Sequence, residues 1–178
     1  MEEAYAGDII GVFDPGIYSI GDTLTVPGKS FRFEGIPTFA PEHFTRVSPR
    51  DTMKRKQFIK GTEQIAQEGA IQIFKVPNTG MEEVIVGVVG TLQFDVFQYR
   101  MKNEYGVDMR MENLPYEYLR FITACPVEPK DLNLSSDAEL LEDYRGNSLL
   151  VFSSYWSINF NLKKNPGLEL SETRSAEA

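Results

Sequence analysis

Val84-Ile85-Val86-Gly87-Val88-Val89 is followed directly by Gly90-Thr91 and by a run rich in large apolar residues. Successive apolar residues of this kind are typical of a strand that is buried on both faces. The residues that follow change to helical periodicity, with apolar side chains in two rows. One row consists of Leu92, Val96 and Tyr99, and the other of Phe94, Phe97, Met101 and Tyr105. We therefore predict a buried strand that leads straight into a helix, which ends at Gly106.

A strand and a helix precede this pair, and further strands flank it. Residues 44–47 favour a strand and residues 52–68 favour a helix. Strands are also expected over 70–76 and over 107–112, where apolar residues alternate with polar or charged ones. The order over residues 39–112 is thus β-α-β-β-α-β. This is the split βαβ or ferredoxin-like signature of an α+β domain, in which two helices cover one face of a four-stranded antiparallel sheet.

The N-terminal residues 1–30 favour short strands. β-rich runs over 8–13 and 23–26 are separated by turn residues, and residues 31–34 form a further run of the same kind. Two or three short strands cannot enclose a core. We expect this segment to pack on the following domain or to belong to a larger one.

The domain extends beyond this core to about residue 166. Ser136 and Glu139 form a capping box, which predicts a short acidic helix over about 137–144. The other elements expected are strands over 116–123 and 149–153, a helix over 155–164, and a flexible tail over 167–178.

The composition is that of a folded protein, with 178 residues, 42% of them hydrophobic and 25% charged. A chain of this length buries enough surface for one ordinary core. The sequence contains no apolar run of about 20 residues and begins with acidic residues, so we expect a cytoplasmic protein without a membrane partner. A single cysteine, Cys125, and a single histidine, His43, exclude an internal disulfide and the usual structural zinc site.

The net charge of −8 disfavours general binding to nucleic acids, but the charge is uneven. Residues 128–143 contain six acids and one lysine, whereas residues 46–60 contain six cations and one acid. The cations are Arg46, Arg50, Lys54, Arg55, Lys56 and Lys60. They could bind RNA phosphates or an acidic protein surface, or they could form an ordinary solvated helix face.

The residues needed for several kinds of chemistry are missing. No glycine-rich loop ends in Gly-Lys-Ser/Thr, so a phosphate-binding loop is excluded. His43 has no evident nucleophile or orienting partner. The strands at 71–73 and 84–86 lack the paired aromatics of an RNA-recognition module. We therefore predict no catalytic, cofactor-binding or metal-binding residues.

Specific stretches resemble a known family. Residues 4–12 and 20–24 look like the closing strands of the β-barrel second domain of translational GTPases. The block over 86–96, with Leu-Gln-Phe-Asp-Val at its end, resembles the bacterial class-II release factors, the release factor 3 family. Elongation factor G has a different sequence at this point. The resemblance covers residues 3–165.

This resemblance implies that residues 1–30 are the last strands of the barrel and residues 31–166 the C-terminal release-factor domain. It implies a role in translation termination, as a lever region of a GTPase that promotes dissociation of class-I release factors from the ribosome. The GTP-binding domain is absent from this chain, so the chain itself is not expected to be an enzyme or to hold a cofactor. The implied partners are the ribosome, through a small-subunit protein or rRNA, the class-I release factors, and the factor's own GTP-binding and barrel domains. We expect the six cations at 46–60 to contact the ribosome.

Two alternatives remain open from the sequence. The chain could be the equivalent piece of an elongation-type or ribosome-protection GTPase. It could also be a small phosphohydrolase on a ferredoxin-like sheet, although the segment 46–50 lacks the glycines of a phosphate-binding loop.

Overall fold

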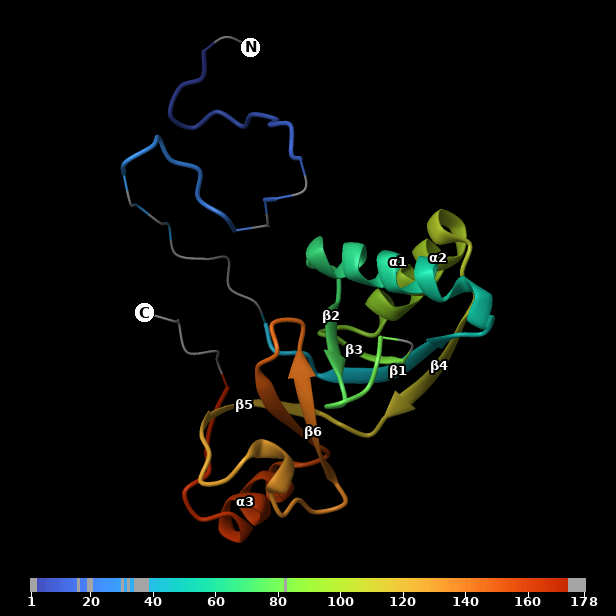
Figure 1. Ribbon diagram of the computed structural model, residues 1–178, viewed down its shortest axis with the longest axis vertical. Coiled ribbons are helices and arrows are strands. Elements are labelled where there is room, and N and C mark those ends of the chain that lie inside the picture. The colour runs from blue at the N-terminus through green and yellow to red at the C-terminus, as the bar shows by residue number, and fades with distance from the viewer. Residues whose placement is uncertain are drawn as a thin grey trace. The chain divides into compact units, whose positions relative to one another are not determined.

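The computed structural model describes residues 3–15, 17–18, 21–29, 31, 33, 39–81 and 83–172. The chain divides into two compact units, Met1–Pro37 and Thr38–Ala178. All helices and strands of the described residues lie in the second unit (Figure 1). None of the helices in these ranges has the length and apolar composition that a membrane span requires.

The described residues of the first unit form turns and irregular segments without a strand. The strands predicted over 8–13 and 23–26 are therefore wrong, and the run at 31–34 includes residues outside the described ranges. A strand needs a neighbouring strand to accept its backbone hydrogen bonds, and no strand pairs with the described part of this segment. Large apolar side chains here are solvent-exposed, such as Ile9 at 98% and Phe13 at 89%.

The first half of the second unit has the predicted β-α-β-β-α-β order. Its elements are β1 (His43–Pro49), the 3₁₀ turn η1 (Thr52–Lys54), α1 (Arg55–Gln67), β2 (Gln72–Lys75), β3 (Val84–Val88), α2 (Leu92–Tyr105) and β4 (Met109–Leu114). The strands lie in the order β4-β1-β3-β2 and every neighbouring pair is antiparallel. Both helices cover the same face of this sheet (Figure 1). The predicted ferredoxin-like core is confirmed.

Strand β3 is buried along its whole length, as predicted. Val84, Val86 and Val88 pack against α1 and α2, whereas Ile85 points to the opposite face and belongs to a second hydrophobic cluster. A strand that is buried on both faces shows no polar alternation, which explains its sequence.

The second half of the unit continues the same sheet. Its elements are β5 (Tyr118–Ala124), the 3₁₀ turn η2 (Pro129–Asp131), β6 (Ala138–Asp143), β7 (Ser148–Phe152), α3 (Tyr155–Lys164) and β8 (Glu169–Ser171). β6 pairs with β2, so that one sheet of eight strands runs in the order β4-β1-β3-β2-β6-β7-β5-β8. The second cluster packs side chains of the two halves together, including Phe44 of β1 and Val151 of β7. A third cluster holds α3 against the outer face of the second half.

Two predictions for this half are wrong. The acidic helix predicted over 137–144 is strand β6, because Leu141 packs into the second cluster and Leu140 contacts the third. An alternating strand can supply both clusters at once, and this tertiary gain overrides a local capping signal. Residues 169–171, predicted to lie in a flexible tail, form β8 beside β5. The predicted helix over 155–164 is confirmed.

Two buried asparagines fix α3 to the loop that precedes β6. Asn161 accepts a hydrogen bond from the backbone N–H of Ser135 (2.9 Å) and donates to its hydroxyl (2.7 Å). Asn165 accepts from the backbone N–H of Asn133 (2.8 Å) and donates to its carbonyl (3.2 Å). Each amide thus satisfies loop groups that would otherwise be costly to bury, and α3 is held in one position.

The close approach of α1 and α2 depends on Gly61. A Cβ at this position would lie 2.7 Å from the Tyr105 ring and 2.8 Å from the Met101 sulfur. We expect Gly61→Ala to lower the free energy of unfolding by about 1–2 kcal/mol, because crowding outweighs the gain in helix propensity. Urea unfolding followed by circular dichroism measures this.

The control is Gly90→Ala, since a Cβ there meets no heavy atom within 4 Å. Its stability should change by less than about 0.5 kcal/mol. Equal stabilities of the two variants would contradict the packing argument.

Candidate functional site

The structure separates the six cations predicted to form one site. Arg46 lies on β1 beside Val47, whose side chain packs under the helices. Successive strand residues point to opposite faces, so Arg46 lies on the face away from the helices. Its guanidinium is paired with Glu83 at 3.5 Å and with Glu139 at 3.9 Å. Arg46 therefore belongs to a different surface from the cations of α1.

Arg50 and Lys54 lie between these two surfaces and are engaged in the fold. Arg50 donates through Nε to the carbonyl of Met109 (3.1 Å) and through its backbone N–H to that of Asp108 (2.9 Å). The Nζ of Lys54 lies 3.9 Å from where a Cβ of Gly106 would stand, at the C-terminal end of α2. The partial negative charge of that helix end stabilises the ammonium group.

Arg55, Lys56 and Lys60 occupy the solvent side of α1, and we call these three residues the α1 basic face. All three are exposed, whereas the buried residues of the helix are Phe58, Gly61, Thr62 and Ile65. Among the described residues, no carboxylate forms a salt bridge with Lys56 or Lys60. These two ammonium groups, four residues apart, are available to an anionic partner.

The acidic run 128–143 does not form one acidic surface. Glu142 pairs with Lys75 at 3.2 Å. Asp143 is buried and accepts backbone hydrogen bonds from Arg145 (2.8 Å) and Asn147 (2.9 Å), which shapes the β6–β7 turn. A hydrogen bond from the Ser135 hydroxyl lowers the pKa of Asp137. The sequence count of charges therefore overstates the acidity that a partner meets.

A small polar cluster forms where Arg46 meets the second half of the sheet. Tyr116 donates its phenolic hydrogen bond to Glu139 (3.0 Å), which also faces Arg46. Burial, followed by the negative charge of Glu139, raises the pKa of Tyr116 to about 12. The cluster ties β6 to the segment before β5 and works as a structural element.

The block over 86–96 is explained largely by packing. The Oε1 of Gln93 accepts hydrogen bonds from the backbone N–H groups of Val89 and Gly90, both at 3.0 Å, and its Nε2 donates to the carbonyl of Ala70 (2.9 Å). Gln93 thus fixes the turn between β3 and α2 to the chain that enters β2. At Gly87 a Cβ would lie 2.8 Å from the Pro41 side chain, so a larger residue at position 87 would displace Pro41.

A similar anchor joins the ends of the two helices. Arg100 of α2 forms hydrogen bonds with Glu104 (2.8 and 2.9 Å) and also pairs with Glu68, just beyond α1. The hydrogen bonds that Arg100 donates to Glu104, the largest cause, and to Glu68 raise the pKa of Arg100. The bond from Arg100 lowers the pKa of Glu104. The arrangement is a surface ion-pair network that supports the helix pair.

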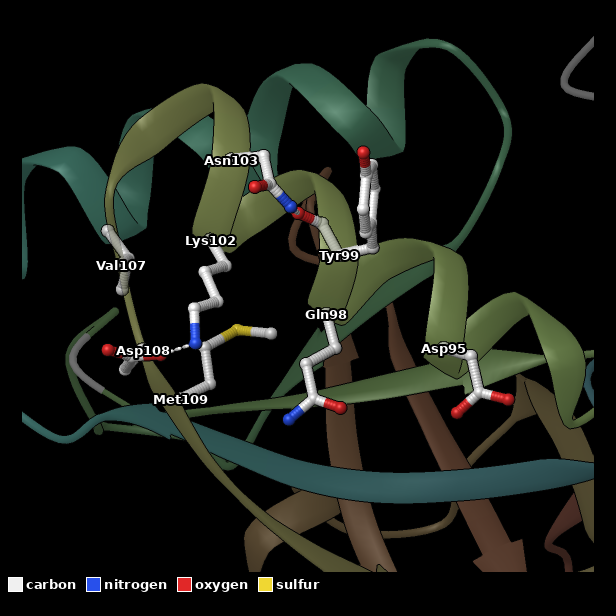
Figure 2. Close-up of a pocket in the computed structure, with 8 residues that line it drawn as sticks. All are labelled: Asp95, Gln98, Tyr99, Lys102, Asn103, Val107, Asp108 and Met109. Atoms are coloured by element: carbon white, nitrogen blue, oxygen red, sulfur yellow. Dashed lines mark hydrogen bonds and ion pairs between the residues drawn. The ribbon is translucent and has the colours of Figure 1, made fainter.

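A hollow of about 290 Å³ lies between α2 and β4 (Figure 2). It is lined by Asp95, Gln98, Tyr99, Lys102, Asn103, Val107, Asp108 and Met109. Lys102 reaches across to Asp108 at 3.4 Å, as Figure 2 shows. The lining holds no nucleophile paired with a base. In the described part of the chain, no group of three His, Cys, Asp or Glu side chains could hold a metal ion.

The alkaline stability of the protein should depend on Tyr116. Its pKa is about 12 in the folded chain, against 10.0 ordinarily, so the unfolded chain loses this proton first. Stability should therefore fall as the pH rises from about 10 to about 12, and Tyr116→Phe should reduce that fall. Denaturant unfolding across this pH range measures it. In Glu139→Gln the pKa of Tyr116 should move back toward 10.0. An unchanged alkaline slope in Tyr116→Phe would refute this assignment.

Comparison with known proteins identifies the family. The model for "Class II release factor RF3, C-terminal domain" matches residues 33–161. Peptide chain release factor 3 of Symbiobacterium thermophilum is 47% identical over 176 residues, which are 99% of this chain and 33% of that protein. The proteins of that name from Listeria welshimeri and Gloeobacter violaceus are 44% and 40% identical, over 96% and 97% of this chain and 32% of each protein. The chain spans about a third of the length of these relatives. It belongs to the class II release factor 3 family and contains the C-terminal domain of that family.

Proposed function

We propose that this chain acts in translation termination, as the ribosome-contacting and interdomain lever region of a release factor 3. In this proposal the complete factor is a GTPase that promotes dissociation of class-I release factors after the peptide has been released. The family match and the shared name of the relatives support the assignment to termination.

The observation that carries the lever role is the continuity of the eight-stranded sheet. α1 and α2 cover one end and α3 covers the other, and the two halves share the second hydrophobic cluster (Figure 1). A body whose parts share one sheet and one packed interior transmits a displacement instead of absorbing it. The GTP-binding and barrel domains of the complete factor would apply the movement at one side, and the ribosome would meet the other.

Catalysis in this proposal resides outside the chain. The relatives are about three times as long, which leaves room for a GTP-binding domain elsewhere in the complete factor. GTP is then a cofactor of that domain, and this chain contributes shape and contacts. The factor works in the cytoplasm, where the ribosome and the class-I release factors are found.

The ribosome contact is assigned to the α1 basic face, with Arg50 and Lys54 at its edge. The support is the exposure of Lys56 and Lys60 and the lack of a salt bridge to either among the described residues. Arg46 is left out, since it is held by Glu83 and Glu139 on the opposite face of the sheet. Small-subunit rRNA and an acidic ribosomal protein are both suitable partners for this face.

Neutralising the α1 basic face tests the proposal. In the complete release factor, Lys56→Ala with Lys60→Ala should slow dissociation of class-I release factors from the ribosome. At low salt this variant should bind ribosomes more weakly than the parent factor does. The loss of two phosphate contacts should reduce the salt slope, the slope of log affinity against log salt concentration, by about 2. A further variant adds Arg50→Ala, Lys54→Ala and Arg55→Ala and should have a larger effect.

The matched control is Lys102→Ala, which removes an exposed lysine of α2 that is paired with Asp108. It should leave both the dissociation rate and the salt slope as they are in the parent factor. If the five-residue variant has unchanged dissociation rates and an unchanged salt slope, the α1 basic face does not contact the ribosome.

A further inference from the structure

Helix α3 presents its aromatic side chains to solvent. Tyr155 is 62% exposed and Trp156 is 65% exposed, and Phe160 lies one turn further along at 36%. The sheet-facing side of the same helix is formed by Ser157, Ile158 and Asn161. Several large exposed aromatics on one helix face are uncommon in a soluble domain and mark a surface that binds a partner.

These side chains form a stacked ladder. The Trp156 and Phe160 rings have centroids 4.9 Å apart and planes inclined by 17°. The Lys164 Nζ lies 5.4 Å from the centroid of the Phe160 ring. The three residues follow one another at intervals of four along the helix, so a single row carries indole, phenyl and ammonium groups. The side chains of this row are ordered before a partner binds, which lowers the entropic cost of binding.

The charge of this face selects an anionic partner. None of the ten residues of α3 is acidic, and Lys163 and Lys164 are exposed in its last turn. Tyr155 extends the aromatic surface to Tyr118, where the ring centroids are 6.5 Å apart. The nearby Arg120 is paired with Glu172 at 2.7 Å, so among the described residues the cations of this face that lack a salt bridge are Lys163 and Lys164. A ligand that is both planar and anionic matches these groups better than an acidic peptide, which supplies charge without rings.

We propose that the outer face of α3 binds a single-stranded segment of RNA, with an unpaired base stacked on Trp156 and the backbone phosphates at Lys163 and Lys164. Base stacking on aromatic side chains beside cations is the usual way in which proteins hold unpaired nucleotides. This inference rests on the proposed function, in that the ribosome supplies the RNA. It concerns a second surface, because α3 and the α1 basic face lie at opposite ends of the sheet (Figure 1).

The fold holds this surface rigidly. The hydrogen bonds of Asn161 and Asn165 to the loop at 133–135 fix the helix from its buried side. Ser154 caps its first turn by accepting a hydrogen bond from the Ser157 N–H at 3.2 Å. The stacked rings therefore stand on a helix that cannot easily rotate.

Trp156 is the one tryptophan of the chain, so its fluorescence reports directly on the proposed site. The probe is an unstructured RNA of about ten nucleotides, within the usual range of single-strand sites. Titration of the 178-residue chain should quench this fluorescence as a base stacks on the indole. A perfectly paired RNA duplex of the same sequence should bind more weakly, because its bases are already stacked.

Two variants separate stacking from charge, with affinity measured by the anisotropy of labelled RNA. Trp156→Leu should weaken binding about tenfold through the loss of one stacked base. Lys163→Ala with Lys164→Ala should lower the salt slope by about 1.4, as expected for two single-strand phosphate contacts. Because these positions are exposed, circular dichroism should show that both variants are folded.

The matched control is Tyr144→Leu, which removes another exposed aromatic that lies beside a cation. Tyr144 is 75% exposed, with the Arg145 guanidinium 5.3 Å from its ring, but it lies in the β6–β7 turn. This variant should bind RNA as the parent chain does. An equal loss in Tyr144→Leu and Trp156→Leu would overturn the assignment to α3.

Other outcomes also overturn the inference. One is an RNA affinity that Trp156→Leu leaves unchanged. The other is quenching of the Trp156 fluorescence by an acidic peptide but not by RNA, which would make α3 a protein-docking face. Failure of the proposed function is read from a different measurement. Unchanged dissociation of class-I release factors in the α1 variants would refute the α1 contact. The RNA titration of α3 would still test the binding of RNA to α3 independently.

Discussion

The architecture depends on the short antiparallel pairing between β2 and β6. Phe74 lies opposite Asp143 and Lys75 opposite Glu142, and the latter pair also forms an ion pair at 3.2 Å. Through these two positions the ferredoxin-like half and the C-terminal half become one sheet of eight strands. Phe74 also packs into the cluster shared by both halves. Hydrogen bonds alone would leave so short a join weak, and the apolar packing beside it supplies most of its stability.

This join gives the unit two ends that differ in chemistry. One end carries α1 with Lys56 and Lys60 on its solvent side, and the other carries α3 with exposed aromatics and lysines. Between the two ends, the buried side chains of the second hydrophobic cluster come from both halves of the sheet. Both proposals place contacts at these ends, so the intervening sheet acts as the connecting element. A lever needs a rigid central part and partner-binding surfaces at its two ends.

The charge pattern shows how local pairing changes a sequence argument. The runs at 46–60 and 128–143 appear strongly opposite in the sequence, yet Arg46 and Glu139 lie beside each other in the fold. The Asp143 carboxylate accepts a hydrogen bond within the β6–β7 turn, and Arg50 donates one to the carbonyl of Met109, the first residue of β4. What remains exposed on α1 is a smaller set of cations than the sequence predicted. The aromatic face of α3 was absent from the sequence prediction altogether, although its spacing of Trp156, Phe160 and Lys164 was visible as a helical row.

The sequence by itself determined the ferredoxin-like half, because its signals are local: periodicity in α1 and α2, glycine at the end of α2, and unbroken burial in β3. The Leu-Gln-Phe-Asp-Val block determined the family in the same way. The tertiary structure alone decided that residues 138–143 form a strand and that residues 169–171 complete the sheet. Their conformation depends on partners distant in the chain, which are β2 for β6 and β5 for β8. The stabilisation from such pairings cannot be read from any short segment of the sequence. It therefore outweighs the local helix-capping preference at Ser136.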